Sequence, residues 1–167
     1  ASLMVMVYMG GHVSGAHYNP AVSLAALLRG ALPSGDFVPY VVSQVAGATV
    51  AAFAVNVITG QTFAPAPAAT ATTLAALLVE VLFTFALALV VLNVATSKKT
   101  TGNSYYGLAI GLTVMTGAFA GGGISGGAFN PAVGIGPTII NATMGGGGWS
   151  SLWLYLVGPL AGGALAA

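Results

Sequence analysis

A nine-residue stretch that occurs twice constrains the fold of this chain more than any other feature. Residues 14–22 read SGAHYNPAV, and residues 125–133 read SGGAFNPAV. The two copies lie 111 residues apart (130 − 19), and at the same offset Gly47 matches Gly158. An offset that holds without a gap over this distance indicates an internal repeat rather than a chance similarity between segments rich in Ala, Val and Gly.

Charge is scarce, which indicates the medium in which the repeat folds. Only 3% of the residues are charged and 57% are hydrophobic, whereas soluble domains carry about 25% charged residues. The formally charged side chains are Arg29, Asp36, Glu80, Lys98 and Lys99. We therefore predict an all-α membrane protein surrounded by the lipid bilayer. The net charge of +1 argues against a nucleic-acid partner, and the absence of cysteine excludes thiol chemistry and cysteine-based metal sites, so we expect no cofactor and no metal.

Apolar runs predict several membrane helices of two different lengths. Runs long enough to span the bilayer lie at 37–59, 71–95, 105–120 and 150–167, the last of which stops early. Residues 1–10 are predicted to be the tail of a further membrane helix. Two shorter helices are predicted at 20–29 and 131–140, each of ten residues. Ten helical residues cover roughly 15 Å, which is half of a bilayer core.

The repeat predicts one domain built from two halves. Residues 1–59 are expected to be the remainder of the first repeat, 60–70 a loop between the repeats, and 71–167 the second repeat. An odd number of spans in each repeat would invert one half relative to the other, and inverted repeats with paired short helices mark the substrate path in membrane transport folds. The counterpart of residue 71 would lie about 40 residues before Ala1 (71 − 111 = −40). We expect one whole span and the start of the next to be absent from this chain.

The basic residues predict an orientation in the membrane. Arg29 follows the first short helix, and Lys98 and Lys99 lie in a polar loop. If the short helices re-enter the membrane rather than cross it, these two loops lie on one side, which the positive-inside rule makes cytoplasmic. The segments 60–70 and 141–149 contain no Lys or Arg and are expected on the outer side.

Asn-Pro-Ala, the polar centre of each copy, is a helix cap by its local chemistry. It comprises Asn19, Pro20 and Ala21 in the first copy and Asn130, Pro131 and Ala132 in the second. Asn is a preferred N-cap and Pro suits the first helical position. Because both caps begin half-length helices, they are predicted near the membrane midplane, buried in protein or lining a wet cavity.

The caps also predict how a pore would select its permeant. A capping Asn accepts backbone hydrogen bonds through its side-chain oxygen, so we expect the NH₂ donors of both amides to be free for one oxygen atom of a permeating molecule. The positive ends of two half-helices repel cations and protons and let a neutral molecule pass. Unwound segments before the caps are expected to expose carbonyl groups along the path, at Gly15, Ala16, His17, Gly126 and Ala128.

Three polar side chains within the apolar regions have more than one interpretation. Glu80 lies inside a predicted span, where a carboxylate costs roughly 2.5–3.5 kcal/mol on insertion scales, so we favour a structural role with hydrogen-bond partners over a proton relay. Gln44 is expected to form hydrogen bonds in the protein interior rather than in the pore. His17 is expected to pack and to contact the pore through its backbone, with a pH-sensitive gate as the alternative.

The paired stretches resemble the signature loops of the aquaporin family, also called the major intrinsic proteins. Further segments follow in family order: SQVAGA (43–48), LLVEVLFTF (77–85), GLAIGLTVM (107–115) and LWLYLVGPLAGG (152–163). The resemblance implies an inverted repeat of six transmembrane helices plus two half-helices, a pore in each subunit and a homotetramer. The segment expected to be absent matches the first helix of the family and the front of the second. The resemblance also implies that Glu80 forms hydrogen bonds with the backbone of a signature loop.

The resemblance further implies a selectivity filter on the extracellular side, to which Ala118, Gly127 and Val133 would contribute. Most members carry Arg directly after the second Asn-Pro-Ala, where this chain has Val133. Small and apolar residues at these positions imply a wider and less polar ring than that of water-selective members. Glycerol-conducting members usually have Asp at the position of Gly134, so the glycerol type is not indicated.

The favoured function is a channel for passive, bidirectional permeation of water and small uncharged solutes such as glycerol, urea or ammonia, with exclusion of ions and protons. One alternative is a structural or junction membrane protein with a closed or vestigial pore. Another is a secondary transporter, which usually needs intramembrane charges for ion coupling, and Glu80 is the only one available.

Overall fold

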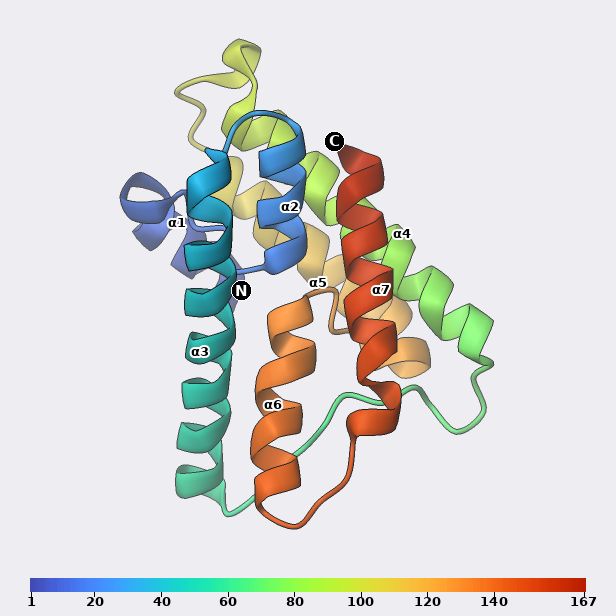
Figure 1. The fold of residues 1–167 in the computed structure, drawn as a ribbon. Helices are drawn as coiled ribbons and strands as arrows, with labels where there is room; N and C mark the ends of the chain where they lie inside the picture. Colours follow the sequence, from blue (N-terminus) through green and yellow to red (C-terminus); the bar gives the residue numbers. More distant parts are fainter.

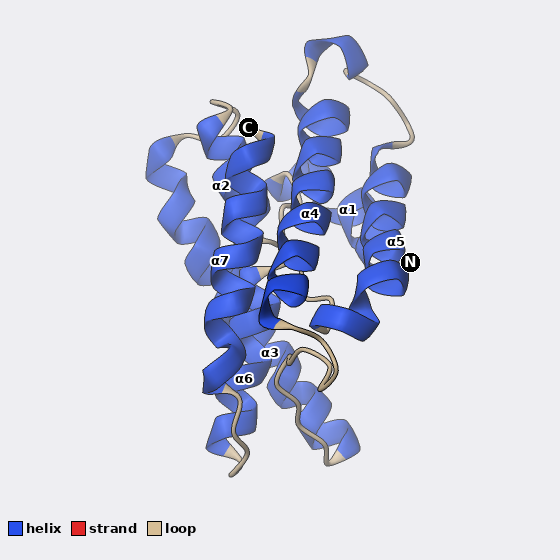
Figure 2. Ribbon diagram, turned by 90° about the vertical axis from the view of Figure 1, so that its right-hand side faces the viewer, coloured by secondary structure: helices blue, strands red, loops and turns tan.

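The structure is a computed structural model that describes all 167 residues, and Figure 2 shows helices and loops without any strand. The helices are α1 (Ser2–Ser14), α2 (Pro20–Leu28), α3 (Ser34–Thr59), α4 (Thr73–Val91), α5 (Tyr106–Ser125), α6 (Pro131–Thr143) and α7 (Trp149–Ala166). A π-helical turn, η1 (Leu92–Thr96), extends α4, and a 3₁₀ turn, η2 (Lys98–Thr100), follows it. The prediction of an all-α fold is confirmed.

Three of the helices are long and apolar enough to cross a membrane: α3, the helix formed by α4 with η1, and α5. α3 begins three residues earlier than predicted, at Ser34, and α5 continues to Ser125 rather than ending at residue 120. α7 has 18 residues and is not among the three. The three apolar helices α3, α4 with η1, and α5 make the chain an integral membrane protein.

The two short helices meet end to end in the middle of the molecule (Figure 1). α2 has nine residues, close to the prediction, whereas α6 has 13 and is longer than predicted. Each begins at a Pro that occupies the first turn behind an Asn cap, which is the place where the missing N–H of proline costs nothing. The connection between α2 and α3 and the connection between α4 and α5 lie at one end of the molecule in Figure 1, and the α3–α4 and α6–α7 connections lie at the other.

The loops that precede α2 and α6 turn sharply by the same backbone device. The helices before them end at Gly15 (φ 70°) and Gly126 (φ 89°), in the left-handed conformation that glycine adopts without steric cost. Tyr18 and Phe129, directly before the Asn caps, also have positive φ, of 49° each. For residues with a Cβ this conformation is uncommon and costs about 1–2 kcal/mol, so both loops depend on contacts elsewhere to hold their shape.

α4 and α7 pack closely against each other. A Cβ atom added to Gly158 would lie 2.7 Å from Cβ of Glu80, and one added to Gly162 would lie 2.4 Å from the backbone oxygen of Val81. Such close backbone approach is typical of small residues at helix interfaces in membranes. A second buried cluster joins α1, α2, α4 and α5 through Val7, Val22, Leu87, Val91 and Ile110. α3 differs from α7, because none of its residues is buried.

Candidate functional site: a central cavity between two half-helices

Both asparagines of the repeated stretch cap their helices. Oδ1 of Asn19 accepts a hydrogen bond from the backbone N–H of Ala21 at 2.9 Å, and Oδ1 of Asn130 accepts one from the N–H of Ala132 at 3.0 Å. Each cap satisfies one of the N–H groups that a helix start leaves without an intrahelical partner. Asn19 is buried and Asn130 is half-buried.

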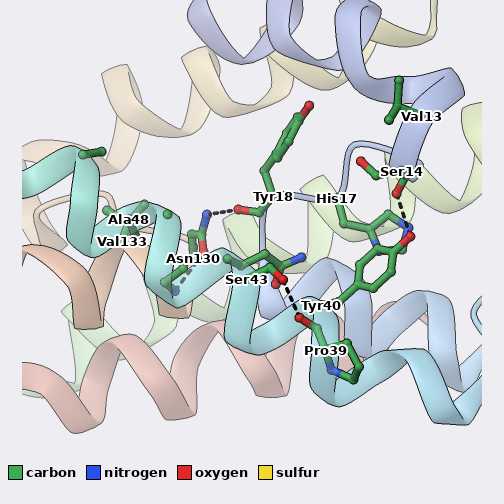
Figure 3. A pocket seen from close by; sticks show the side chains of 14 residues that line it. Val13, Ser14, His17, Tyr18, Pro39, Tyr40, Ser43, Ala48, Asn130 and Val133 are labelled. Carbon is green, nitrogen blue, oxygen red and sulfur yellow. Dashed lines mark hydrogen bonds between the residues drawn. The ribbon is translucent and has the colours of Figure 1, made fainter.

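The amide nitrogens of the two caps bind across to the opposite loop, which corrects the prediction that all their donors are free. Nδ2 of Asn19 donates to the backbone oxygen of Phe129 at 2.8 Å, and Nδ2 of Asn130 donates to the backbone oxygen of Tyr18 at 2.9 Å (Figure 3). A primary amide has two N–H donors, so one remains on each Asn. The pair of bonds links the two half-helix starts directly and orients both amides.

Glu80 holds the second loop. The carboxylate is fully buried and accepts three hydrogen bonds: from Oγ of Ser125 at 2.7 Å, from N–H of Ala128 at 3.1 Å and from N–H of Phe129 at 2.7 Å. A buried carboxyl group needs such partners, since an unpaired one in an apolar environment is costly. The bonds fix the backbone of the loop immediately before Asn130. Sequence reasoning did not assign Ser125 a role, although the repeat that pairs it with Ser14 was a signal.

A central cavity of about 230 Å³ contains both caps. Its polar lining includes Asn19, Asn130 and His17, and its apolar wall is formed by residues of α2, α4 and α5: Val22, Leu87, Val91, Ile110 and Val114. No formally charged side chain lines it. A second cavity of about 430 Å³ shares Gly15, His17, Val91 and Ile110 with the first and reaches η1, η2 and the loop that follows. The second cavity lies on the side of the first that faces the Lys98 end of the molecule, and the two share part of their walls.

His17 lines both of these cavities and also a groove of about 690 Å³ along α3 (Figure 3). Its Nδ1 lies 3.0 Å from Oγ of Ser23, which also accepts a hydrogen bond from Nε2 of Gln44 at 2.9 Å. The imidazole ring packs against Tyr40, with the ring centres 5.2 Å apart. The side chain of His17 is therefore held by α2 and α3. The roles of Ser23 and Tyr40 were not predicted, because neither residue stands in a recognisable pattern.

The remaining predicted site residues lie around the cavities to different extents. Gly15, Ala16 and Ala128 line the central cavity, as does Val133, which is 36% exposed and also borders the groove along α3. Gly126 and Ala118 are exposed and Gly127 is half-buried, and none of these three lines any of the three cavities. Of the three residues predicted for the filter, only Val133 therefore borders the central cavity.

Comparison with known proteins agrees with this architecture. The family model described as "Major intrinsic protein" matches residues 1–167. The chain is 37% identical to "Aquaporin NIP1-1" of Zea mays over 163 residues and 40% identical to "Aquaporin NIP1-3" of Oryza sativa subsp. japonica over 165 residues, in both cases across 96% of this chain. It spans 56% and 55% of the length of these relatives.

A solved structure has the same fold. The aquaglyceroporin from Plasmodium falciparum superposes with a TM-score of 0.87 at 21% sequence identity, over 98% of this chain and 74% of that one. The identity is low, so this likeness concerns the fold alone. The family match extends over the whole chain and coincides with two Asn-Pro caps joined at the centre of the molecule. This chain belongs to the major intrinsic protein family.

Proposed function

We propose that this chain forms the pore of a channel for passive, bidirectional permeation of water and small uncharged solutes. The observation that carries the proposal is the pair of asparagines that line one central cavity from two opposed half-helices. Each amide keeps one N–H after the cross-loop bond, so two donors are available to the oxygen atom of a permeating molecule. The rest of the wall is mostly apolar and holds such a molecule weakly, which suits rapid passage.

Exclusion of ions and protons is part of the proposal. The central cavity lacks a formally charged side chain that would replace the hydration shell of an ion. The N-termini of α2 and α6 meet there, and each carries roughly half a positive charge, which disfavours cations. A water molecule whose oxygen accepts hydrogen bonds from both amides has no lone pair left to accept one from the next water along the path. The chain of water molecules is therefore interrupted for proton transfer at that point.

The arrangement in the membrane is proposed from the same features. We place the loops of Arg29 and of Lys98 and Lys99 in the cytoplasm, because they are the basic connections and lie at one end of the molecule (Figure 1). Family likeness supports a homotetramer with one pore in each subunit. Residues 1–59 and 71–167 are proposed to be the two inverted halves of a single channel domain.

Stopped-flow light scattering from proteoliposomes tests the channel. We expect osmotic shrinkage faster than that of empty liposomes, and we expect Val114→Trp to slow it several-fold, because Val114 lines the central cavity. Leu108→Trp is the matched control, since Leu108 lies on the same helix but is 44% exposed. Shrinkage no faster than that of empty liposomes, or unchanged by Val114→Trp, would favour the structural protein with a closed pore.

The choice among solutes is tested at Val133. A Val133→Arg substitution introduces a long cationic side chain at the edge of the central cavity. We expect it to lower the flux of glycerol, urea or ammonia more than that of water. An equal loss for all solutes would place Val133 outside the selective part of the path.

A further inference from the structure

The connection between α3 and α4 runs across the end of the molecule opposite Lys98 (Figure 1). We call its residues 61–68, which read QTFAPAPA and form neither helix nor strand, the strap. Pro65 and Pro67 each hold φ at about −65°, and segments rich in proline are extended and semi-rigid. A change in the position of one end of the strap is therefore passed to the other end rather than absorbed between them.

The far end of the strap packs on the start of the loop before α6. A Cβ atom added to Gly126 would lie 2.9 Å from the backbone oxygen of Ala66. The N–H of Ala68 donates to the backbone oxygen of Ile124 at 3.0 Å, one of the carbonyl groups that the end of α5 leaves without an intrahelical partner. Three residues of the same loop line the central cavity: Ala128, Phe129 and Asn130. The strap therefore packs on a segment that forms part of the cavity wall.

Asn141, in the last turn of α6, holds the near end of the strap. Its Oδ1 accepts a hydrogen bond from Oγ1 of Thr62 at 2.7 Å, and its Nδ2 donates to the backbone oxygen of Gly147 at 2.6 Å. Gly147 is one of four consecutive glycines in the α6–α7 connection, and glycine loses more conformational freedom on ordering than any other residue. The strap also packs on this connection, because a Cβ atom added to Gly148 would collide with Cβ of Ala64. One side chain therefore binds both connections at this end of the molecule.

We propose that Asn141 is a positioning residue for solute selectivity, which acts through the strap on the loop before α6. This role rests on the proposed channel function. Oδ1 of Asn141 fixes Thr62, the two prolines carry that position along the strap, and Ala66 and Ala68 hold the start of the loop in place. When the bond to Thr62 is lost, the strap no longer supports the loop, and the wall of the central cavity yields to solutes larger than water. A residue that only stabilises the end of α6 has no such effect on selectivity.

Thr62→Val tests the proposal, because valine has the shape of threonine without its hydroxyl donor. In proteoliposomes we expect the ratio of urea flux to water flux to rise at least about twofold in this variant. Hydrogen–deuterium exchange is measured on the same samples at two bonded amides, the N–H of Ala68, which donates to Ile124, and the N–H of Gly127, which donates to Oγ of Ser125. We expect exchange at least about tenfold faster at Ala68 and about threefold faster at Gly127.

Two further variants separate the position of the strap from the stability of α6. Thr62→Ser keeps the hydroxyl donor and should restore both the flux ratio and the exchange rates of the parent protein. Thr143→Ala is the matched control at the same end of α6, since the hydroxyl of Thr143 bonds only within its own helix, to the backbone oxygen of Ile140 at 2.9 Å. This control should change neither the flux ratio nor the exchange at Ala68 and Gly127.

The exchange rates and the flux ratio together decide the role of Asn141. Exchange at Ala68 that Thr62→Val leaves unchanged overturns the proposal. Faster exchange at Ala68 with an unchanged rate at Gly127, or with an unchanged flux ratio, also overturns it and leaves Asn141 a residue that stabilises the end of α6. A parent protein that fails to conduct contradicts the proposed function instead, and the exchange rate at Gly127 then decides whether the strap holds the loop.

Discussion

α3 and α7 occupy equivalent places in the two halves of the repeat. α3 packs on α6 but has no fully buried residue, whereas α7 is covered on more sides. α7 has six buried residues, and α3 has none. The difference does not come from composition, because both helices carry small residues at matching positions, such as Gly47 and Gly158. It comes from α4, which packs on α7 and brings Glu80 to the adjacent loop. Burial in this fold is thus decided by the neighbouring helix more than by the helix itself.

The comparison also shows one contact that both halves make through residues at different positions of the repeat. The backbone oxygen of Ser125 accepts a hydrogen bond from the hydroxyl of Tyr155 at 2.5 Å, and the backbone oxygen of Ser14 accepts one from the hydroxyl of Tyr40 at 2.9 Å. Tyr155 corresponds by offset to Gln44 (155 − 111 = 44), not to Tyr40. In each half, a tyrosine hydroxyl of α3 or α7 therefore donates to the equivalent serine carbonyl, but the two tyrosines lie on different turns of their helices.

Substitution of Glu80, whose contacts exist in the second half only, should cause the largest loss in the free energy of unfolding. Glu80→Leu removes the acceptor of two backbone N–H groups and one hydroxyl in a buried site. Each buried donor left unsatisfied costs about 1–3 kcal/mol, so we expect at least about 3 kcal/mol lost from the free energy of unfolding. Denaturant titration in detergent micelles measures it. A loss below about 1 kcal/mol would mean that the second loop is held by other contacts.

The two capping asparagines should matter equally, although the halves around them differ. Asn19→Ala and Asn130→Ala each remove a cap, which costs about 1 kcal/mol, and a cross-loop hydrogen bond, which contributes about 1 kcal/mol. We expect each variant to lose about 2 kcal/mol in the same titration. Losses that differ by more than about 1 kcal/mol would show that one loop depends on its own half rather than on the opposite Asn.

A methyl group added to each equivalent glycine compares a packed position of α7 with an open position of α3 directly. Gly158→Ala places a Cβ 2.7 Å from Cβ of Glu80, whereas Gly47→Ala meets nothing within 4 Å. Overpacking of a tight interface costs about 1–3 kcal/mol, so we expect Gly158→Ala to lower the melting temperature in detergent. Gly47→Ala should leave it unchanged or raise it slightly, since Ala favours helix. Equal effects would contradict the exposure of α3.

The smallest effect is expected at the repeated serines. Ser125→Ala removes the hydrogen bonds of its hydroxyl with Glu80 and with the N–H of Gly127, and should lower the free energy of unfolding by about 1–2 kcal/mol. Ser14→Ala should change it by less than about 0.5 kcal/mol, because surface substitutions away from such contacts stay within that range.

The sequence predicted those features of the site that arise from local chemistry. The caps of α2 and α6 join an Asn to an N–H two residues further on, so a short motif contains all the information needed. The second bond of each amide reaches a carbonyl more than 100 residues away, and no local pattern indicates such a partner, which is why the amides were expected to be free. Likewise, whether Ala118 and Val133 share a cavity depends on how α5 is rotated, which spacing alone does not determine.

The reciprocal bonds between the loops have a consequence for the order in which this protein is completed during synthesis. The amide of Asn19 finds its acceptor only at Phe129, 110 residues later in the chain. When the ribosome has delivered the first half to the membrane, its re-entrant loop still carries a positive-φ tyrosine that its cross-loop bond does not yet support. The first half alone therefore lacks both cross-loop hydrogen bonds, which require the second loop to be present.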